Sequence, residues 1–89
     1  MGLDAVEFVL QSEKAFGLEL PDEEVGSVST VGEFADLIHQ KLLDKFGVDN
    51  SPNSEAVFEK VKALLIEKQS VPERIIFRHS RFVQDLHLD

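Results

Sequence analysis

Residues 3–24 read LDAVEFVLQSEKAFGLELPDEE, and this stretch decides the fold that we predict for the chain. Apolar residues recur near helical spacing from Leu3 to Phe16, which predicts an amphipathic helix with acidic residues among the apolar ones. Gly17 can end this helix, because glycine adopts a left-handed conformation without a Cβ clash. The helix start is unusual, since Gly2 offers no side-chain acceptor to cap it.

Two further helices are predicted in the first half of the chain. Pro21 fixes a turn, and the acidic residues after it suit the first turn of a short helix that we expect to end near Val28. Thr30 and Glu33 can form a capping box, in which each side chain accepts a hydrogen bond from the other residue's backbone N–H. A long helix then follows and ends at Gly47. Its apolar stripe consists of Val31, Phe34, Leu37, Ile38, Leu42 and Phe46.

The second half contains a linker, one long helix and an irregular arm. Residues 48–54 (VDNSPNS) are the most linker-like segment, and Ser51 with Pro52 suits the N-cap and first position of a helix that runs to Gln69. The apolar face of this helix consists of Val57, Phe58, Val61, Leu64 and Leu65. The apolar residues of the arm are Ile75, Ile76, Phe77, Phe82, Val83, Leu86 and Leu88. They are too numerous to be left in water, so we expect the arm to pack on the helices.

These elements predict an all-α protein, a small four-helix bundle with three long helices, one short helix and a long ordered loop. A chain of 89 residues can bury one modest core, so we expect residues 1–89 to form a single domain. The pattern shows neither a strand with alternating polarity nor an internal repeat.

The net charge of −8 comes from the first half of the chain. Residues 1–50 hold eleven acidic and three basic residues, whereas residues 51–89 hold six of each. A negative surface repels phosphate backbones, so we expect no nucleic-acid binding and expect partners that carry basic patches.

Composition also limits the chemistry. The chain has no cysteine, which excludes disulfides and thiolate metal sites, and we expect no structural metal. The three histidines are scattered rather than spaced as ligands, and we expect His39, His79 and His87 to be surface or capping residues. No apolar run approaches the roughly 20 residues that cross a bilayer, and the N-terminus lacks a leader pattern. We therefore expect a cytoplasmic protein that does not enter a membrane.

Two segments resemble a known family. Residues 3–38 (LDAVEFVLQSEKAFGLELPDEEVGSVSTVGEFADLI) resemble the second half of an acyl carrier protein, in which DSLD and VE precede a helix ending in FG, an LPDEE turn and an STV cap. Residues 57–89 (VFEKVKALLIEKQSVPERIIFRHSRFVQDLHLD) resemble the first half of such a protein, a helix followed by a V-x-x-E turn and an F-V-x-DL arm. Both segments match without gaps, but their order is reversed.

The reversed order predicts a circularly permuted carrier domain. In this interpretation residues 1–47 match the family's second to fourth helices, residues 48–54 are a new linker, and residues 55–89 match its first helix and following loop. The old termini would be joined through Lys45 to Ser54, and such a span of about ten residues reaches up to about 33 Å, enough for a small bundle. The alternative is a tandem carrier array cut at the wrong boundary, which could swap its arm into a neighbouring molecule. We expect a monomer, with a swapped dimer as the alternative.

The resemblance also places the family's prosthetic group. Acyl carrier proteins hold 4′-phosphopantetheine on the serine of DSL, at a helix start where free N–H groups favour the phosphate. In the permuted order, Asp89, Gly2 and Leu3 match the three residues of the family's DSL motif, so Gly2 stands at the position of the serine. Glycine has no hydroxyl, so we expect no prosthetic group on this chain. The resemblance thus implies a domain of the fatty-acid or polyketide synthesis type, a part of lipid metabolism, that no longer carries acyl groups. It also implies that Asp89 lies near Leu3 in space.

The first predicted helix contains the candidate partner-binding residues. They are Asp4, Val6, Glu7, Leu10 and Glu13. The resemblance implies that this face docks on basic grooves of carrier-dependent synthesis enzymes, whereas the simpler interpretation is a solvated helix face. We do not expect an enzyme, because no nucleophile, base and oxyanion donor converge in any segment. The second functional hypothesis is therefore an acidic helical interaction module.

Two features of the sequence each allow more than one interpretation. The interior residues could line a cavity for an acyl chain or form a closed core, and we expect the closed core. These residues are Phe8, Val9, Phe16, Val28, Phe34, Ile38, Leu64, Phe82 and Leu86. In addition, His87 stands where the family usually has glycine, which leaves open whether the arm keeps its usual turn.

Overall fold

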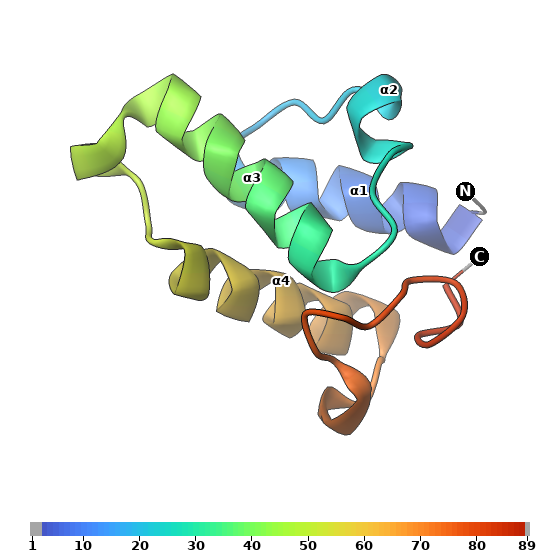
Figure 1. Ribbon diagram of the computed structural model, residues 1–89. Helices are drawn as coiled ribbons and strands as arrows, with labels where there is room; N and C mark the ends of the chain where they lie inside the picture. Colours follow the sequence, from blue (N-terminus) through green and yellow to red (C-terminus); the bar gives the residue numbers. More distant parts are fainter. Residues whose placement is uncertain (1–2, 89) are drawn as a thin grey trace.

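The chain folds as four α-helices followed by an ordered arm. A computed structural model describes residues 3–88, and over that range it contains helices and turns, with one isolated β-bridge between Thr30 and Arg81. The helices are α1 (Leu3–Phe16), α2 (Asp22–Val25), α3 (Val31–Phe46) and α4 (Ser54–Gln69), and the short 3₁₀ turns are η1 (Val48–Asn50) and η2 (Glu73–Ile75). The predicted all-α bundle, with three long helices and one short helix, is therefore confirmed (Figure 1).

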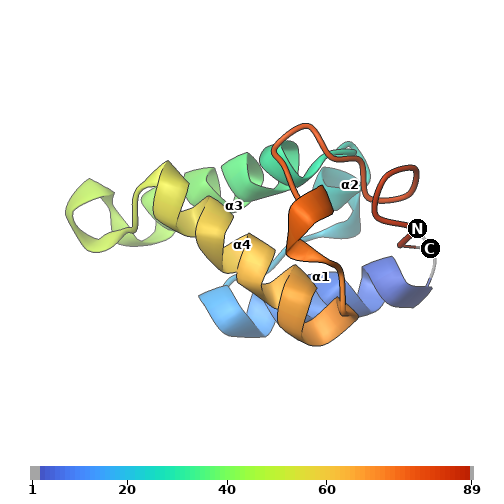
Figure 2. The same ribbon diagram turned by 90° about the horizontal axis from the view of Figure 1, so that it is seen from below.

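The long helices pack around one apolar core. Helix α4 packs against both α1 and α3. The arm, defined here as residues 71–88, turns back from the end of α4 and passes the start of α3 on its way toward the start of α1 (Figures 1 and 2). The core draws buried side chains from all four α-helices and from the arm. The arm is thus part of the folded core rather than a loose tail.

Helix ends follow the predicted chemistry at α1 and α3. Gly17 has φ +67°, and the Glu13 carbonyl accepts hydrogen bonds from the N–H groups of Gly17 (2.9 Å) and Leu18 (3.2 Å). Both halves of the capping box between Thr30 and Glu33 are present. Local sequence therefore fixes where these helices begin and end.

Helix α2 is shorter than predicted. It ends at Val25 rather than near Val28, because the Gly26 N–H closes on the Asp22 carbonyl (2.8 Å) and the chain then turns. The Val28 N–H donates to the Val25 carbonyl in that turn (3.0 Å). As a result, both valines contact the core, although only Val25 is helical.

The predicted start of α4 was also wrong. Asn53, not Ser51, is the N-cap, and its Oδ1 accepts a hydrogen bond from the Ala56 N–H (2.8 Å). The Ser51 hydroxyl instead donates to the carbonyls of Leu42 (2.9 Å) and Gly47 (2.7 Å). Asparagine caps a helix as well as serine does, so Ser51 is not needed as the cap of α4 and can hydrogen-bond to the end of α3.

The arm does not bury all of its apolar residues. Phe77 is 51% exposed and Val83 is 50% exposed, contrary to the prediction, while Ile76, Phe82 and Leu86 are buried. The reason is local, because the short turns of the arm direct some side chains away from the helices. Phe46 of the α3 stripe is likewise 43% exposed, since α3 ends beyond the packed core. Within residues 3–88, no helix has the length and apolar character needed to cross a bilayer.

Candidate functional site

The predicted cofactor position is at the start of α1, where the two ends of the chain are expected to meet, and the structure describes only part of this region. Gly2 and Asp89 fall outside the described residues, as does the side chain of Leu3, so the expected proximity of Asp89 to Leu3 stays a prediction. Their neighbours are described, and the last turn of the arm lies beside the first turn of α1 in both views (Figures 1 and 2). Ala5 of α1 and Leu88 of the arm line the same small cavity.

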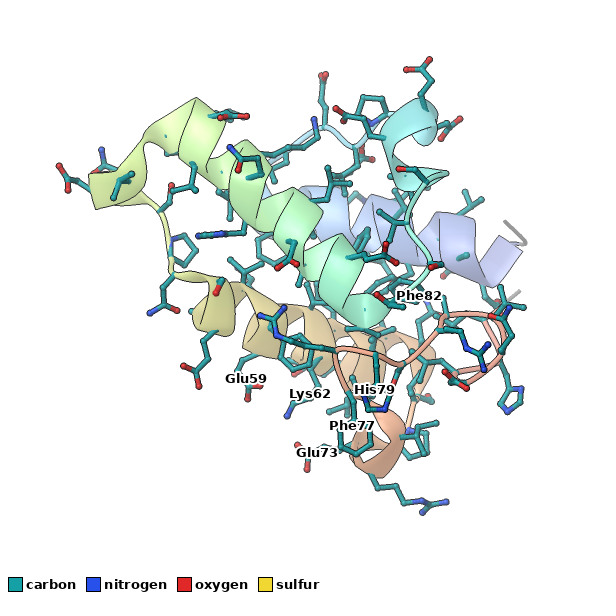
Figure 3. All side chains as sticks on the ribbon, viewed as in Figure 1. Glu59, Lys62, Glu73, Phe77, His79 and Phe82 are labelled. Atoms are coloured by element: carbon teal, nitrogen blue, oxygen red, sulfur yellow. The ribbon has the colours of Figure 1, made fainter. Side chains whose placement is uncertain are left out.

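Three phenylalanine rings join the arm to α1 and α3. The ring centroid of Phe82 lies 6.1 Å from that of Phe8 in α1 and 5.7 Å from that of Phe34 in α3. The Phe8 and Phe34 centroids are 5.5 Å apart, and all three residues are at most 9% exposed. Aromatic pairs at these distances each contribute about 0.5–1.5 kcal/mol beyond their buried area. The cluster therefore holds the arm, through Phe82 (labelled in Figure 3), against the two helices.

The first N–H groups of α3 are bound by the arm. The Val31 N–H donates to the Ser80 carbonyl (2.9 Å), and the Gly32 N–H donates to the Arg78 carbonyl (2.9 Å). The N–H groups of a helix's first turn have no partners within the helix, so these two bonds satisfy donors that would otherwise need water. Ser80 is itself buried, and its hydroxyl accepts from the Phe77 N–H (2.8 Å). This end of α3 is closed and offers no anion site.

Glu33 is the strongest electrostatic feature of the α3 cap. Its Oε1 accepts hydrogen bonds from the Ser29 hydroxyl (2.9 Å), the Ser29 N–H (3.2 Å) and the Thr30 N–H (3.0 Å). These bonds, with that of the Ser29 hydroxyl first, lower the pKa of Glu33 below its ordinary value of 4.5. The ionised carboxylate is therefore the form that the cap binds.

An arginine and a carboxylate hold the last turn of the arm. Asp85 Oδ2 accepts hydrogen bonds from the Arg81 N–H (2.8 Å) and from Arg81 Nε (3.2 Å). The side-chain bond from Arg81 is the main cause that lowers the pKa of Asp85. The backbone of the arm is thus fixed just before its final residues.

His87 forms a turn in a conformation that favours glycine. Its φ is +60°, its N–H donates to the Val83 carbonyl (3.1 Å), and the next N–H, of Leu88, donates to the Phe82 carbonyl (2.9 Å). The arm therefore turns at this position with histidine in place of glycine. A side chain in the left-handed region costs about 1–2 kcal/mol, which the surrounding contacts must offset.

The candidate partner-binding residues spread over exposed and half-buried positions of α1. Val6 and Leu10 are 46% and 54% exposed, and Asp4 and Glu7 are exposed beside them. Glu13 differs, because it is half-buried and its Oε2 accepts a hydrogen bond from the Leu20 N–H (2.7 Å). Glu13 thus has a structural role in the turn after α1, whereas the other four residues are available for contact.

Among the described residues, the cavity in the core is too small for an acyl chain. The cavity shared by Ala5 and Leu88 has a volume of about 10 Å³, room for about one water molecule. Five of the nine residues considered for an acyl cavity line it, namely Phe8, Val9, Val28, Phe34 and Phe82. The other four, Phe16, Ile38, Leu64 and Leu86, are buried in the packed core. A chain of methylene groups would need the core to open.

The histidines do not converge. His79 lies in the arm, with its ring stacked on that of Phe77 at a centroid distance of 5.3 Å and an interplanar angle of 2° (Figure 3). His39 is half-buried on α3, and His87 is exposed in the turn described above. Among residues 3–88, no three His, Asp or Glu side chains are grouped so as to hold a metal ion.

Two contacts of the arm were missed at the level of sequence. The exposed stack of Phe77 and His79 lies in a tight turn, in which the Ser80 N–H donates to the Phe77 carbonyl (3.0 Å), and no regular spacing in the chain signals it. The position of Arg78, with its guanidinium 5.0 Å above the Phe58 ring and 3.3 Å from Asp36 Oδ1, has no such signal either. It joins residues that are far apart in the chain, so only the tertiary structure shows it.

Part of the chain is similar to acyl carrier proteins. It is 47% identical over 36 residues to the acyl carrier protein of Rubrobacter xylanophilus, a match that covers 40% of this chain and 44% of that protein. The acyl carrier protein of Thermosynechococcus vestitus is 42% identical over 40 residues (45% of this chain, 49% of that protein), and that of Lactobacillus acidophilus is 52% identical over 31 residues (35% and 39%). Each match therefore spans less than half the length of the relative.

These partial matches support a relation to the acyl carrier protein family, and the relatives are carriers rather than enzymes. No family profile matches the chain. No solved structure matches it either. The all-helical bundle agrees with an acyl-carrier-like domain.

Proposed function

We propose that this chain is an acyl-carrier-type domain of fatty-acid or polyketide synthesis whose two halves stand in permuted order and which carries no prosthetic group. The observation that supports it best is the position of the arm. Leu88, near the end of the sequence, and Ala5, near its beginning, line one cavity. An ordinary carrier domain would run directly from one to the other, so this proximity is what the permuted order requires.

The partial matches support the same proposal. A comparison that follows chain order can align only one of two segments whose order is reversed. Matches that cover 35–45% of the chain are therefore expected for a permuted relative. The linker supports it as well, because residues 48–54 are mostly exposed and lead from the end of α3 into the start of α4. The assignment of 1–47, 48–54 and 55–89 to family elements in one domain stays a prediction.

The residues that are described do not fit a phosphopantetheine site. The family needs a serine at the start of the helix that corresponds to α1, and in the described part of α1 the sole serine is Ser12. Ser12 is 0% exposed, and its hydroxyl donates to the Phe8 carbonyl (2.9 Å). It can neither reach solvent nor receive a phosphodiester. Gly2, at the position that the resemblance assigns to the modified serine, has no hydroxyl.

A transfer assay tests the proposal. The chain is incubated with coenzyme A and a phosphopantetheinyl transferase that accepts many carriers, and its intact mass is measured. We expect no mass gain for the natural chain. Gly2→Ser is expected to gain one phosphopantetheine, because it restores the hydroxyl at the helix start. A gain on the natural chain would contradict the loss of the carrier role, and an unmodified Gly2→Ser variant would count against the permuted carrier.

The state of association tests the permutation separately. For a permuted domain we expect a monomer, in which the arm covers α1 and α3 of its own chain. A piece of a carrier array would exchange arms between two chains and have twice the mass in solution. Light scattering at several concentrations separates the two outcomes. The proposal includes a cytoplasmic location and no binding to nucleic acid or membranes.

A second candidate function is an acidic helical interaction module. The observation that favours it is the exposed pair Val6 and Leu10 next to Asp4 and Glu7, an apolar contact with an acidic border. Such a face suits a partner with a basic rim around an apolar groove, such as the docking surface of a carrier-dependent enzyme.

A binding assay against carrier-dependent synthesis enzymes examines this face. Asp4→Lys with Glu7→Lys should abolish binding, because both substitutions reverse charge beside the apolar pair. Glu67→Lys on α4 is the matched control, since it makes a similar change at an exposed helical site elsewhere. Glu13 is left unchanged because of its bond to the Leu20 N–H. If the control weakens binding as much as the double variant, the docking face is not on α1.

A further inference from the structure

An apolar groove lies at the end of the bundle away from the arm. The last turns of α1 and α3, the linker and the first turns of α4 enclose a volume of about 370 Å³. The lining residues are Ala15, Phe16, Leu42, Phe46, Asn50, Pro52, Ala56, Val57 and Lys60. The start of α1, where the cofactor position was sought, is at the other end of that helix (Figure 1).

The groove has the size and surface of a small-molecule site. Phe16, Leu42 and Val57 are buried beneath it, and the ring of Phe46 stands 43% exposed at its side. Its volume falls within the roughly 300–1,000 Å³ that ligand pockets occupy. An exposed aromatic ring beside a buried apolar floor leaves hydrophobic surface that a ligand could cover.

The charge around this groove differs from that of the rest of the surface. None of its nine lining residues has a carboxylate, although the chain has 17 acidic residues. Three other surface grooves of residues 3–88 each have at least one, from Glu13, Glu19, Asp44, Glu55, Glu59 or Glu73. In a protein with a net charge of −8, a lining without carboxylates reduces the repulsion that an anion would meet at this groove.

One lysine lines the groove and a second lies next to one of its rings. Lys60 belongs to the lining, whereas Lys45 lines another groove together with Glu19 and Asp44. Lys60 Nζ donates to the Ala15 carbonyl (3.0 Å) and lies 4.9 Å from the centre of the Phe16 ring. Lys45 Nζ donates to the Gly17 carbonyl (2.8 Å) and lies 5.3 Å from the centre of the Phe46 ring. Within the described part of the chain, neither ammonium has a carboxylate within 4.0 Å.

The two lysines already stabilise the end of α1. Cations near a helix C-terminus bind its last carbonyls and interact favourably with the helix dipole. Each ammonium has three N–H donors, and one bond to a carbonyl leaves two of them for another acceptor. The carbonyl bond and the neighbouring ring position each ammonium before any ligand arrives.

We infer that this groove binds an amphiphilic anion, namely an unbranched alkyl chain with one carboxylate at its end. The chain lies along Phe16 and Phe46, and the carboxylate accepts hydrogen bonds from Lys60, with Lys45 as the second cation. The ligand is bound without any covalent step and without the prosthetic group. The inference is therefore independent of the carrier function proposed above.

Titration with decanoate below its micelle concentration tests the inference. The full chain, labelled with ¹⁵N, is followed by amide NMR at neutral pH. We expect saturable shifts at Asn50, Ala56 and Val57, and weaker binding of decanol and of decyltrimethylammonium. Lys60→Met keeps the apolar stem but removes the ammonium, so it should lower decanoate affinity about tenfold, the loss of one charge-assisted hydrogen bond. Its affinity for decanol should not change.

Three variants serve as controls. Lys68→Met removes an exposed lysine from the last turn of the same helix and should leave decanoate affinity unchanged. Lys60→Arg keeps the charge and should retain most of the affinity. Phe46→Asn alters an exposed side chain, so the fold should survive and binding of both decanoate and decanol should weaken.

Several results would overturn the inference. Shifts confined to Ala5, Val25 and Val28 would place the alkyl chain in the core instead of the groove. Equal affinity of decanoate for the natural chain and a folded Lys60→Met variant would remove the role of the charge. The mass of the protein in solution could also double without decanoate and return to that of one chain in Phe46→Asn. That result would show that a second copy of the chain, not an anion, covers this face.

Discussion

Replacing Gly32 with alanine should separate the arm from α3. A Cβ built at Gly32 would lie 2.8 Å from the Arg78 carbonyl oxygen, 3.1 Å from Arg78 Cβ and 3.3 Å from Arg78 Cα. Real Cβ atoms essentially never approach another atom within 3.0 Å, and the nearest atom here belongs to the backbone. Either α3 or the arm must therefore move, and the hydrogen bond from the Gly32 N–H to the Arg78 carbonyl (2.9 Å) must lengthen.

Two opposing effects decide the size of the change. Alanine is more favourable than glycine inside a helix by about 1 kcal/mol, which stabilises the variant. Against this, overpacking costs about 1–3 kcal/mol, and a weakened hydrogen bond costs about 0.5–1.5 kcal/mol. The net expectation is a loss of about 2 kcal/mol in the free energy of unfolding. For a domain of this size the loss lowers Tm by roughly 10 °C.

Thermal unfolding and amide hydrogen exchange measure the effect. We expect Gly32→Ala to lower Tm and to speed exchange at Val31 and Phe82, whose N–H groups join the arm to the start of α3. Exchange at Val61, in the middle of α4, reports global unfolding and serves as the internal control. A variant that is more stable by about 1 kcal/mol, with unchanged exchange at Phe82, would show helix propensity acting alone. That result would refute the close contact between Gly32 and the arm.

Three further predictions concern the arm and the α3 cap. Phe82→Ala removes a ring from the aromatic cluster and should cost about 3–5 kcal/mol in chemical unfolding, whereas Phe77→Ala should change stability by less than about 1 kcal/mol, because Phe77 is half exposed; similar losses for the two would mean that the arm packs differently. His87→Gly should raise the free energy of unfolding by about 1 kcal/mol, since glycine adopts a positive φ without strain, and a loss of stability would mean that the imidazole makes a contact worth more than the strain. For Glu33 the folded-state pKa is lowered, so its contribution to stability is full at neutral pH and is lost as pH falls below 4.5 and through the folded-state value. Glu33→Gln should therefore lower Tm at pH 7 more than at pH 3, and an equal loss at both values would contradict the role of the ionised carboxylate.

Local rules predicted most of the helices. The ends of α1 and α3 follow from Gly17, Gly47 and the capping box of Thr30 and Glu33, all of which act within one turn of the chain. The error at the start of α4 arose because two local choices were equally good. Ser51 and Asn53 are both strong N-cap residues, and the choice went to Asn53 because the Ser51 hydroxyl donates to carbonyls at the end of α3.

The candidate partner-binding residues of α1 stay a prediction, and the structure adds their surroundings. Exposure of Val6 and Leu10 agrees with a contact face on α1, whereas the hydrogen bond from the Leu20 N–H to Glu13 removes one expected member. The groove beside Phe46 had no signal in the chain order. Its cations, Lys45 and Lys60, come from different helices, and both reach the end of a third.

The sequence by itself determined the helical class, most helix boundaries, the acidic first half and the resemblance to acyl carrier proteins in reversed order. These properties depend on residue type and on spacing over a few turns. Only the tertiary structure decided that the arm binds the start of α3 through Gly32, that Ala5 and Leu88 share a cavity, and that an apolar groove with Lys60 and no carboxylate in its lining forms at the other end of the bundle. The reason is that such contacts join residues distant in the chain, and they form only when helix packing brings those residues within a few ångströms.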